Sequence, residues 1–186
     1  MELIKRFVKR IAAILIRPAA EWAIIATEPG ASSLRLLRYV AILSLIPALA
    51  RFAGASLVGW YAPILPSLAG ALVIYLSSFA IVYAVALAVD ALAPRFGARK
   101  DFASALKLAV YSATPVWLAG IFLLVPGLSF LMIFGFYAAY ILWCGLPILI
   151  QAPAERALLY AVAISLAALI AFLAFGFVEA PLFSPV

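Results

Sequence analysis

The segment YSATPVWLAGIFLLVPGL, residues Tyr111–Leu128, is strongly apolar and carries no charge, yet two prolines interrupt it. Proline in the interior of an α-helix costs about 3 kcal/mol in water, because it removes a backbone donor and its ring crowds the preceding turn. A membrane tolerates this defect when neighbouring helices or hydroxyl groups take up the freed carbonyl. The segment therefore predicts a membrane span kinked at Pro115, with Ser112 or Thr114 available to the freed carbonyl of Tyr111, and an external turn at Pro126-Gly127.

The composition of the whole chain also indicates a membrane protein. Of its 186 residues, 69% are hydrophobic and 11% are charged, and the mean hydropathy is +1.26. A soluble domain is about half apolar and about a quarter charged. Spans need roughly 20 apolar residues, and five stretches qualify: residues 36–60, 66–92, 106–125, 128–150 and 157–178. The predicted fold class is an all-α integral membrane protein, a five-transmembrane-helix bundle over residues 34–186 preceded by an amphipathic interfacial segment over residues 1–33.

The basic residues lie on one side of this arrangement. All of the 13 lysines and arginines except Arg51 precede the first span or flank the connections between spans two and three and between spans four and five. Because cytoplasmic flanks carry the positive excess, we expect a cytoplasmic amino terminus and a carboxyl terminus on the opposite side. The net charge of +6 does not indicate nucleic-acid binding, since the basic residues flank spans and form no groove with aromatic residues.

The first 18 residues, MELIKRFVKRIAAILIRP, predict an amphipathic helix in the membrane surface. At 100° per residue one half of the helix is apolar and the other is basic. The apolar half holds Leu3, Ile4, Phe7, Val8, Ile11, Ile14 and Leu15, and the basic half holds Lys5, Arg6, Lys9, Arg10 and Arg17. We expect these basic side chains to contact anionic headgroups; a signal peptide is the alternative, although the uncharged run from Ile11 to Ile16 is short for one.

Trp22 lies in a second short helix that follows Pro18. It is placed either to anchor that helix at the membrane surface or to pack against the underside of the bundle.

Apart from Arg38 and Lys107 at the starts of their spans, two charged residues, Arg51 and Asp90, fall within the predicted spans, and such residues are functional candidates by default. Arg51 lies roughly 18 Å into the hydrocarbon core, where it could extend toward the headgroups, meet a partner's carboxylate or bind a lipid phosphate. Asp90 lies near the cytoplasmic end of the second span, within reach of Arg95, Arg99, Lys100 or Lys107. Their depths differ, so we do not expect Arg51 and Asp90 to pair.

The chain lacks the residue patterns that enzymes and metal sites need. It has no histidine, no pair of carboxylates at one depth, no glycine-rich phosphate loop and no metal-ligand spacing. We therefore expect neither catalysis nor a cofactor. Small residues at i and i+4, such as Ala50 with Gly54 and Gly135 with Ala139, predict close helix contacts and allow self-association.

An ordered set of residues from the second span onward gives the chain a resemblance to a known family. The set is Asp90, Pro94, Phe96 and Gly97, then Lys107, Tyr111, Pro115, Trp117, Gly120 and Pro126, then Tyr137, Tyr140, Gly145 and Pro147, and lastly Pro153 and Tyr160; Arg17-Pro18 with Trp22 and Ile25 adds to it near the amino terminus. With this set the chain resembles the Yip domain family, which is named for Rab/Ypt-interacting eukaryotic members, and it resembles the bacterial branch most.

The resemblance implies a five-span protein with a cytoplasmic amino terminus, here in a bacterial cytoplasmic (inner) membrane. Eukaryotic relatives are linked to Rab GTPases and vesicle formation through longer cytoplasmic regions. No counterpart of their acidic-aromatic segment precedes the first span, so Rab-type GTPase binding is not carried over.

Three hypotheses of function follow from these observations. The leading one is a non-enzymatic multi-pass protein that organises lipids or partner membrane proteins, in a Yip-like scaffold or trafficking-type role, with anionic lipids, other membrane proteins or itself as partners. The alternatives are a small transporter or channel lined by Arg51 and tyrosines, and an accessory subunit of a larger membrane complex.

Overall fold

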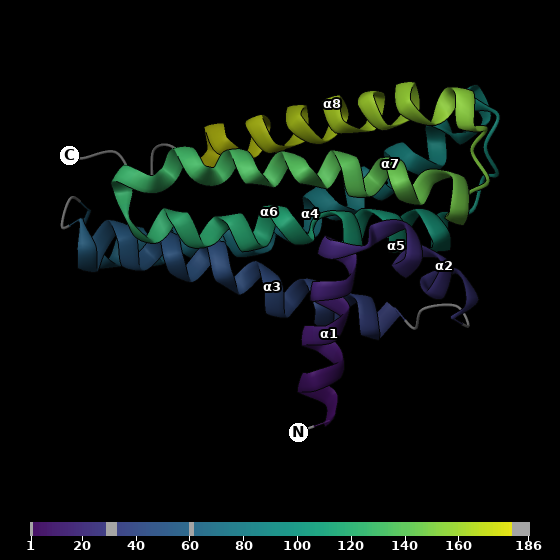
Figure 1. Ribbon diagram of the computed structural model, residues 1–186. Coiled ribbons are helices and arrows are strands. Elements are labelled where there is room, and N and C mark those ends of the chain that lie inside the picture. The colour runs from purple at the N-terminus through teal and green to yellow at the C-terminus, as the bar shows by residue number, and fades with distance from the viewer. Residues whose placement is uncertain (1, 29–32, 60–61, 180–186) are drawn as a thin grey trace.

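The computed structural model describes residues 2–28, 33–59 and 62–179, which are all helical apart from short connections (Figure 1). The α-helices are α1 (Glu2–Ile16), α2 (Pro18–Thr27), α3 (Ser33–Ala53), α4 (Ile64–Leu92), α5 (Phe102–Ser112), α6 (Thr114–Ala119), α7 (Tyr137–Leu149) and α8 (Ala154–Glu179). Four further segments have other helical windings. The π-helical segment is η1 (Gly54–Val58), and the 3₁₀-helical segments are η2 (Ala93–Phe96), η3 (Gly120–Leu124) and η4 (Pro126–Phe136). The side chains of Leu3 and Ile4 and the predicted end of the first span at Trp60 lie outside the described residues.

Five helical segments of the described chain are long and apolar enough to cross a membrane. They run over Leu34–Val58, Ile64–Phe96, Phe102–Leu124, Pro126–Leu149 and Ala154–Gly176. The predicted all-α membrane bundle with five spans is therefore confirmed. Figure 1 shows the spans side by side and α1 transverse to them, with its amino-terminal end projecting beyond the bundle.

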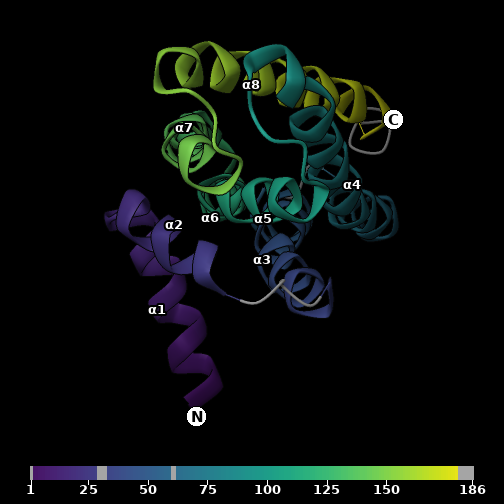
Figure 2. The ribbon, with the colours of Figure 1, turned by 90° about the vertical axis from the view of Figure 1, so that its right-hand side faces the viewer.

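The third span, formed by α5, α6 and η3, is the centre of the bundle. In its apolar window 61% of the residues are buried, against 22%, 28% and 17% in the second, fourth and fifth spans. Figure 2 shows α5 between α3, α4 and α7, while α8 packs on α4 and α7 at the far side from α1 and α2. The outer spans accordingly expose large apolar side chains such as Leu72, Phe134 and Ile170, as a surface facing lipid does.

The third span is broken where the sequence predicts a kink. Helix α5 ends at Ser112 and α6 begins at Thr114, so that Pro115 occupies the first turn of a new helix. The Thr114 hydroxyl donates a 2.6 Å hydrogen bond to the carbonyl of Tyr111. Of the two hydroxyls that the sequence offered, Thr114 is the one that satisfies this carbonyl.

Replacing Thr114 by valine tests this arrangement, because valine keeps the shape and removes the hydroxyl. We expect Thr114→Val to lower the free energy of unfolding in detergent by about 1 to 2 kcal/mol, since the buried Tyr111 carbonyl then loses the hydroxyl that donates to it and the Tyr39 hydroxyl loses its partner. Thr114→Ser retains the hydroxyl and should lose less than half as much. Equal stability of the valine and serine variants would show that the kink does not depend on this bond.

The third and fourth spans were predicted to be plain α-helices. In the halves that meet at their connection near Val125 they are instead wound more tightly, as the 3₁₀-helices η3 and η4. In this half the first and third spans approach backbone to backbone. A Cβ at Gly120 would lie 2.5 Å from Pro47 Cβ, and one at Gly54 would lie 2.2 Å from the Leu123 carbonyl oxygen. Only glycine fits at these two positions, as the small-residue spacing at Gly54 led us to expect.

Candidate functional site

Charged and aromatic side chains gather where α1, α2, α3 and the third span meet. We call Arg10, Glu21, Glu28, Lys107 and Tyr111 the junction cluster. Its members come from α1, from α2 and the residue that ends it, and from α5. The cluster lies in the half of the bundle that contains the connections rich in arginine and lysine, which we call the basic end.

Arg10 ties α1 to α2. Its Nη1 atom lies 2.6 Å from Glu21 Oε1, its Nη2 atom donates to Glu28 Oε1, and its guanidinium carbon lies 5.9 Å from the centre of the Tyr111 ring. Glu21 is buried, so its charge depends on this cation for compensation. Arg10 was predicted from the sequence to contact headgroups, but in the structure it contacts two carboxylates of its own chain.

Lys107 ties the third span to the end of α2. The residue is buried, and its Nζ atom donates to the carbonyls of Glu28 at 3.2 Å and Ile25 at 3.5 Å. The last carbonyls of a helix lack partners within the helix, and they carry the negative end of its dipole. A buried ammonium is therefore stabilised at this position without a carboxylate.

Trp22 fixes α2 against α7. Its side chain is fully buried, and Nε1 donates a 2.9 Å hydrogen bond to the Ile141 carbonyl. Gly145 makes room for the ring, since a Cβ there would lie 2.6 Å from Trp22 Cε2. The structure thus shows the packing alternative for Trp22, and the alternative of an anchor exposed at the membrane surface is wrong.

Aromatic contacts connect the same elements. The ring of Tyr39 lies 5.3 Å from that of Phe7 on α1 and 4.9 Å from that of Tyr111, and its hydroxyl lies 2.8 Å from Thr114 Oγ1. Tyr137 on α7 donates a 2.8 Å hydrogen bond to the Leu15 carbonyl in the last turn of α1. Helix α1 is thus fastened to the rest of the chain near its middle and at its carboxyl end.

A second set of contacts closes the basic end between α4, η2 with the loop that follows it, and α8. Phe96 stacks on Tyr160 with ring centres 4.6 Å apart, and the Tyr160 hydroxyl donates to the Val89 carbonyl. Gly97 adopts a φ of 72°, a conformation that glycine takes without strain. Asp90 Oδ2 lies 3.9 Å from Lys100 Nζ, so the predicted pairing of Asp90 with a neighbouring basic residue is confirmed.

Asp101 begins α5 as its amino-terminal cap. Its carboxylate accepts hydrogen bonds from the backbone N–H groups of Ala103 and Ser104. Partial burial acts to raise the pKa of Asp101, but hydrogen bonds from Arg99 and Ser104 outweigh it and lower the pKa below its usual value. The cap is therefore charged at neutral pH, as suits a helix amino terminus.

The remaining predicted residues lie outside the junction cluster. Lys5, Arg6, Lys9 and Arg17 are exposed on or just after α1, whereas Arg51 is half-buried at the end of α3. Pro126 and Gly127 form the predicted turn, which the 2.8 Å hydrogen bond from the Leu128 N–H to the Val125 carbonyl closes, and they begin η4. Tyr140 is exposed between the rings of Tyr137 and Trp143. Among the residues that the structure describes, no group of three or more His, Cys, Asp or Glu could hold a metal ion.

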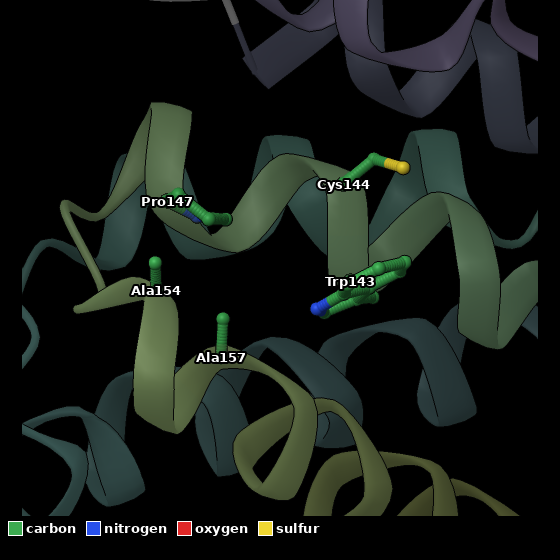
Figure 3. A pocket seen from close by; sticks show the side chains of 5 residues that line it. All are labelled: Trp143, Cys144, Pro147, Ala154 and Ala157. Atoms are coloured by element: carbon green, nitrogen blue, oxygen red, sulfur yellow. The ribbon is translucent and has the colours of Figure 1, made fainter.

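Hollows on the sides of the bundle, as far as the described residues form it, include the following two. The larger one, which we call the α6–η4 groove, has a volume of about 440 Å³. It is lined by Leu15, Pro115, Leu118, Ala119, Ile121, Phe122, Phe134 and Tyr137. The smaller one, of about 180 Å³, lies between α7 and the start of α8 and is lined by Trp143, Cys144, Pro147, Ala154 and Ala157 (Figure 3).

The family model of the Yip1 domain matches residues 12–176. The chain belongs to the Yip1 domain family. The match extends from the second half of α1 through the fifth span, so the Yip1 domain includes Glu21, Glu28, Lys107 and Tyr111. Arg10 lies ahead of the matched residues. No curated protein and no solved structure matches the chain.

Of the junction cluster, Arg10, Lys107 and Tyr111 were candidates from the sequence, whereas Glu21 and Glu28 were missed. The chain holds only seven acidic residues, and two of them follow closely on the basic amino-terminal helix. Because acidic residues are rare in this chain, the two glutamates at positions 21 and 28 indicate that a basic residue of the preceding helix forms an ion pair within the chain.

Proposed function

We propose that this Yip1 domain protein is a non-enzymatic scaffold of a bacterial cytoplasmic membrane, in which α1 lies in the cytoplasmic leaflet and gathers anionic lipids beside the bundle. The observation that carries the proposal is the attachment of α1. An amphipathic helix transverse to the spans is held by the ion pairs of Arg10 and by the Tyr137 bond to Leu15. Its remaining basic side chains are exposed.

Electrostatics supports a preference for anionic lipid. Basic residues near a membrane surface attract anionic lipids with about 1 kcal/mol each, and Arg6, Lys9 and Arg17 are exposed on or beside α1. Because the bundle fixes α1, these charges stay at one position beside the spans. A helix that was connected to the bundle only through the polypeptide, without side-chain contacts, would carry the same charges but would not hold them at one position.

The orientation rests on charge. Arg95, Arg99, Lys100 and Arg156 lie at the basic end, and the positive-inside tendency places such connections in the cytoplasm. With five spans and a cytoplasmic basic end, the amino terminus lies in the cytoplasm and the carboxyl terminus on the opposite side.

Energy transfer in vesicles tests the proposal. A donor dye is attached to Ile16→Cys, an exposed site on α1, in a Cys144→Ser background, and the acceptor is a headgroup-labelled phospholipid that is either anionic or zwitterionic. We expect several-fold stronger transfer to the anionic acceptor, and loss of the preference in about 0.5 M salt, where screening is strong.

Matched variants show whether the lipid preference comes from the basic residues of α1 or from the net positive charge of the protein. Arg6→Gln/Lys9→Gln should abolish most of the preference, while Arg95→Gln/Arg156→Gln, which removes the same charge at exposed sites elsewhere, should keep most of it. Equal transfer to both acceptors in the unmodified sequence would refute the proposal. Solute flux into the same vesicles would favour the transporter hypothesis. Copurification of a stoichiometric partner from native membranes would favour the accessory-subunit hypothesis.

A further inference from the structure

The second span is longer than the hydrocarbon core of a membrane is thick. It runs from Ile64 to Phe96 as 29 α-helical residues followed by 4 residues of 3₁₀-helix. Rises of about 1.5 and 2.0 Å per residue give it a length of about 50 Å. The core is about 30 Å thick, and even a tilt of about 40° leaves the span about 8 Å too long. One of its ends therefore lies outside the hydrocarbon.

Helix α1 shows which end projects. It crosses the bundle part-way along, and the connections of the basic end lie beyond it (Figure 1). It contacts Tyr111 through Arg10 and Tyr137 through Leu15. The lengths of η3 and α6 on one span, and of η4 on the other, put these tyrosines about 23 and 22 Å from the turn at Val125. A turn between spans lies outside hydrocarbon, so α1 lies about 7 Å inside the opposite boundary of a 30 Å core. Interfacial helices lie at this depth, about 5–10 Å.

Exposed aromatic residues with polar atoms gather close to this boundary. Tyr83, Tyr140 and Trp143 are exposed on α4 and α7, about 27–31 Å from the ends of their spans opposite the basic end. Tyrosine and tryptophan are enriched where hydrocarbon meets headgroups. Lys107 lies about 30 Å along the third span, so its buried ammonium is also placed at the boundary.

We infer that the cytoplasmic boundary of the hydrocarbon crosses the bundle at Tyr83, Lys107 and Trp143, and that the basic end projects past it into water. The inference deepens the proposed function, on which it rests for the cytoplasmic orientation, because it assigns the surface that meets the lipid layer. The projecting part consists of the end of α4, η2, the loop that follows η2 and the first turn of α8. Residues 66–92 were predicted to form a complete span, whereas the boundary ends the lipid-covered part of α4 near Tyr83.

The projection separates the basic residues of the bundle from those of α1. Arg95 in η2 lies about 18 Å beyond the boundary, whereas headgroups extend about 5–7 Å beyond the hydrocarbon. Arg95 therefore stands past the headgroups, and the exposed residues Arg99 and Lys100 follow it in the same connection. The basic end is then a surface for water-soluble molecules, and α1 is the basic surface for lipid.

The reaction of introduced cysteines in nanodiscs tests the inference. Ala69, Ala80 and Ala91 are exposed on α4, and their spacing of about three helical turns places them on one face. They lie about 8, 24 and 40 Å from the start of the helix, so only Ala91 is beyond the boundary. Each is replaced by cysteine in a Cys144→Ser background, and the rate of reaction with a charged methanethiosulfonate reagent is measured.

We expect Ala91→Cys to react at least about a hundredfold faster than Ala69→Cys and Ala80→Cys, because the thiolate is the reactive form and hydrocarbon disfavours it. Denaturation in sodium dodecyl sulfate is the control, since the three variants should then react at one rate. Equally slow reaction of Ala80→Cys and Ala91→Cys in nanodiscs would place all of α4 in hydrocarbon and overturn the inference. Fast reaction of Ala69→Cys with slow reaction of Ala91→Cys would show that the other end projects, and would overturn it too.

The energy-transfer experiment distinguishes failure of this inference from failure of the proposed function. If Ala91→Cys reacts slowly while α1 still prefers the anionic acceptor, the position of the boundary is wrong and the proposed function stands. If Ala91→Cys reacts fast while α1 shows no preference, the boundary stands and the gathering of anionic lipids is refuted.

Discussion

Gly145→Leu is expected to lower the free energy of unfolding by about 3 kcal/mol and to release α2 from α7. A Cβ at Gly145 would already lie 2.6 Å from Trp22 Cε2 and 2.7 Å from Leu108 Cδ1. Overpacking a tight contact costs about 1–3 kcal/mol, and displacing a buried tryptophan approaches the cost of its removal, about 3–5 kcal/mol. Displacing the Trp22 ring would also break the hydrogen bond from its Nε1 atom to the Ile141 carbonyl.

The matched control is Gly176→Leu in α8, where no atom beyond the neighbouring residues and backbone of the helix itself lies within 4 Å of an added Cβ. Leucine favours a helix over glycine by roughly 0.8 kcal/mol, so this variant should be as stable as the unmodified sequence or slightly more so. Unfolding is followed by circular dichroism in detergent, and release of α2 by tryptophan fluorescence in a Trp60→Phe/Trp117→Phe/Trp143→Phe background. If Gly145→Leu and Gly176→Leu have the same free energy of unfolding, the packing of Trp22 does not depend on the absence of a side chain at Gly145.

The sequence predicts the number and order of the spans because each depends on local composition. Hydropathy over a window of span length identifies all five, and Pro115 marks the break between α5 and α6. The 3₁₀ winding of η3 and η4 was not predicted. The first and third spans touch there through Gly54 and Gly120, and such contact between distant segments leaves no periodic pattern in either one.

The junction cluster was predicted in part, for a similar reason. Lys107 and Tyr111 stand four residues apart on one face of α5, so the sequence places them together and the family resemblance draws attention to them. That their face meets the carboxyl end of α2 depends on the docking of Trp22 against Gly145. The sequence could not show which basic residue pairs with Glu21 and Glu28. The pairing with Arg10 depends on the rotation of α1 about its axis where it packs on the bundle.

Arg10→Met is expected to detach α1, with a loss of about 3 kcal/mol in the stability of its docked position. The change keeps the aliphatic length and removes the charge, which leaves Glu21 buried beside Glu28 without their common cation. Removing one partner of a buried ion pair costs about 3–5 kcal/mol, and the lower figure applies because the Arg10 side chain is 22% exposed. Amide hydrogen exchange should therefore accelerate over α1 by about a hundredfold, while exchange in α5 and α7 changes little.

Two further variants decide whether charge is the cause. Arg6→Met alters an exposed residue of the same helix and should leave exchange in α1 unchanged. Arg10→Met/Glu21→Gln/Glu28→Gln removes the stranded carboxylates as well as the cation and should recover most of the protection, since a buried ion pair can be replaced by neutral groups at little cost. Unchanged protection in Arg10→Met would contradict the attachment of α1 through the junction cluster. Full loss in the triple variant would show that Arg10 acts through packing against Tyr111, because the charges are then absent and only that contact has been removed.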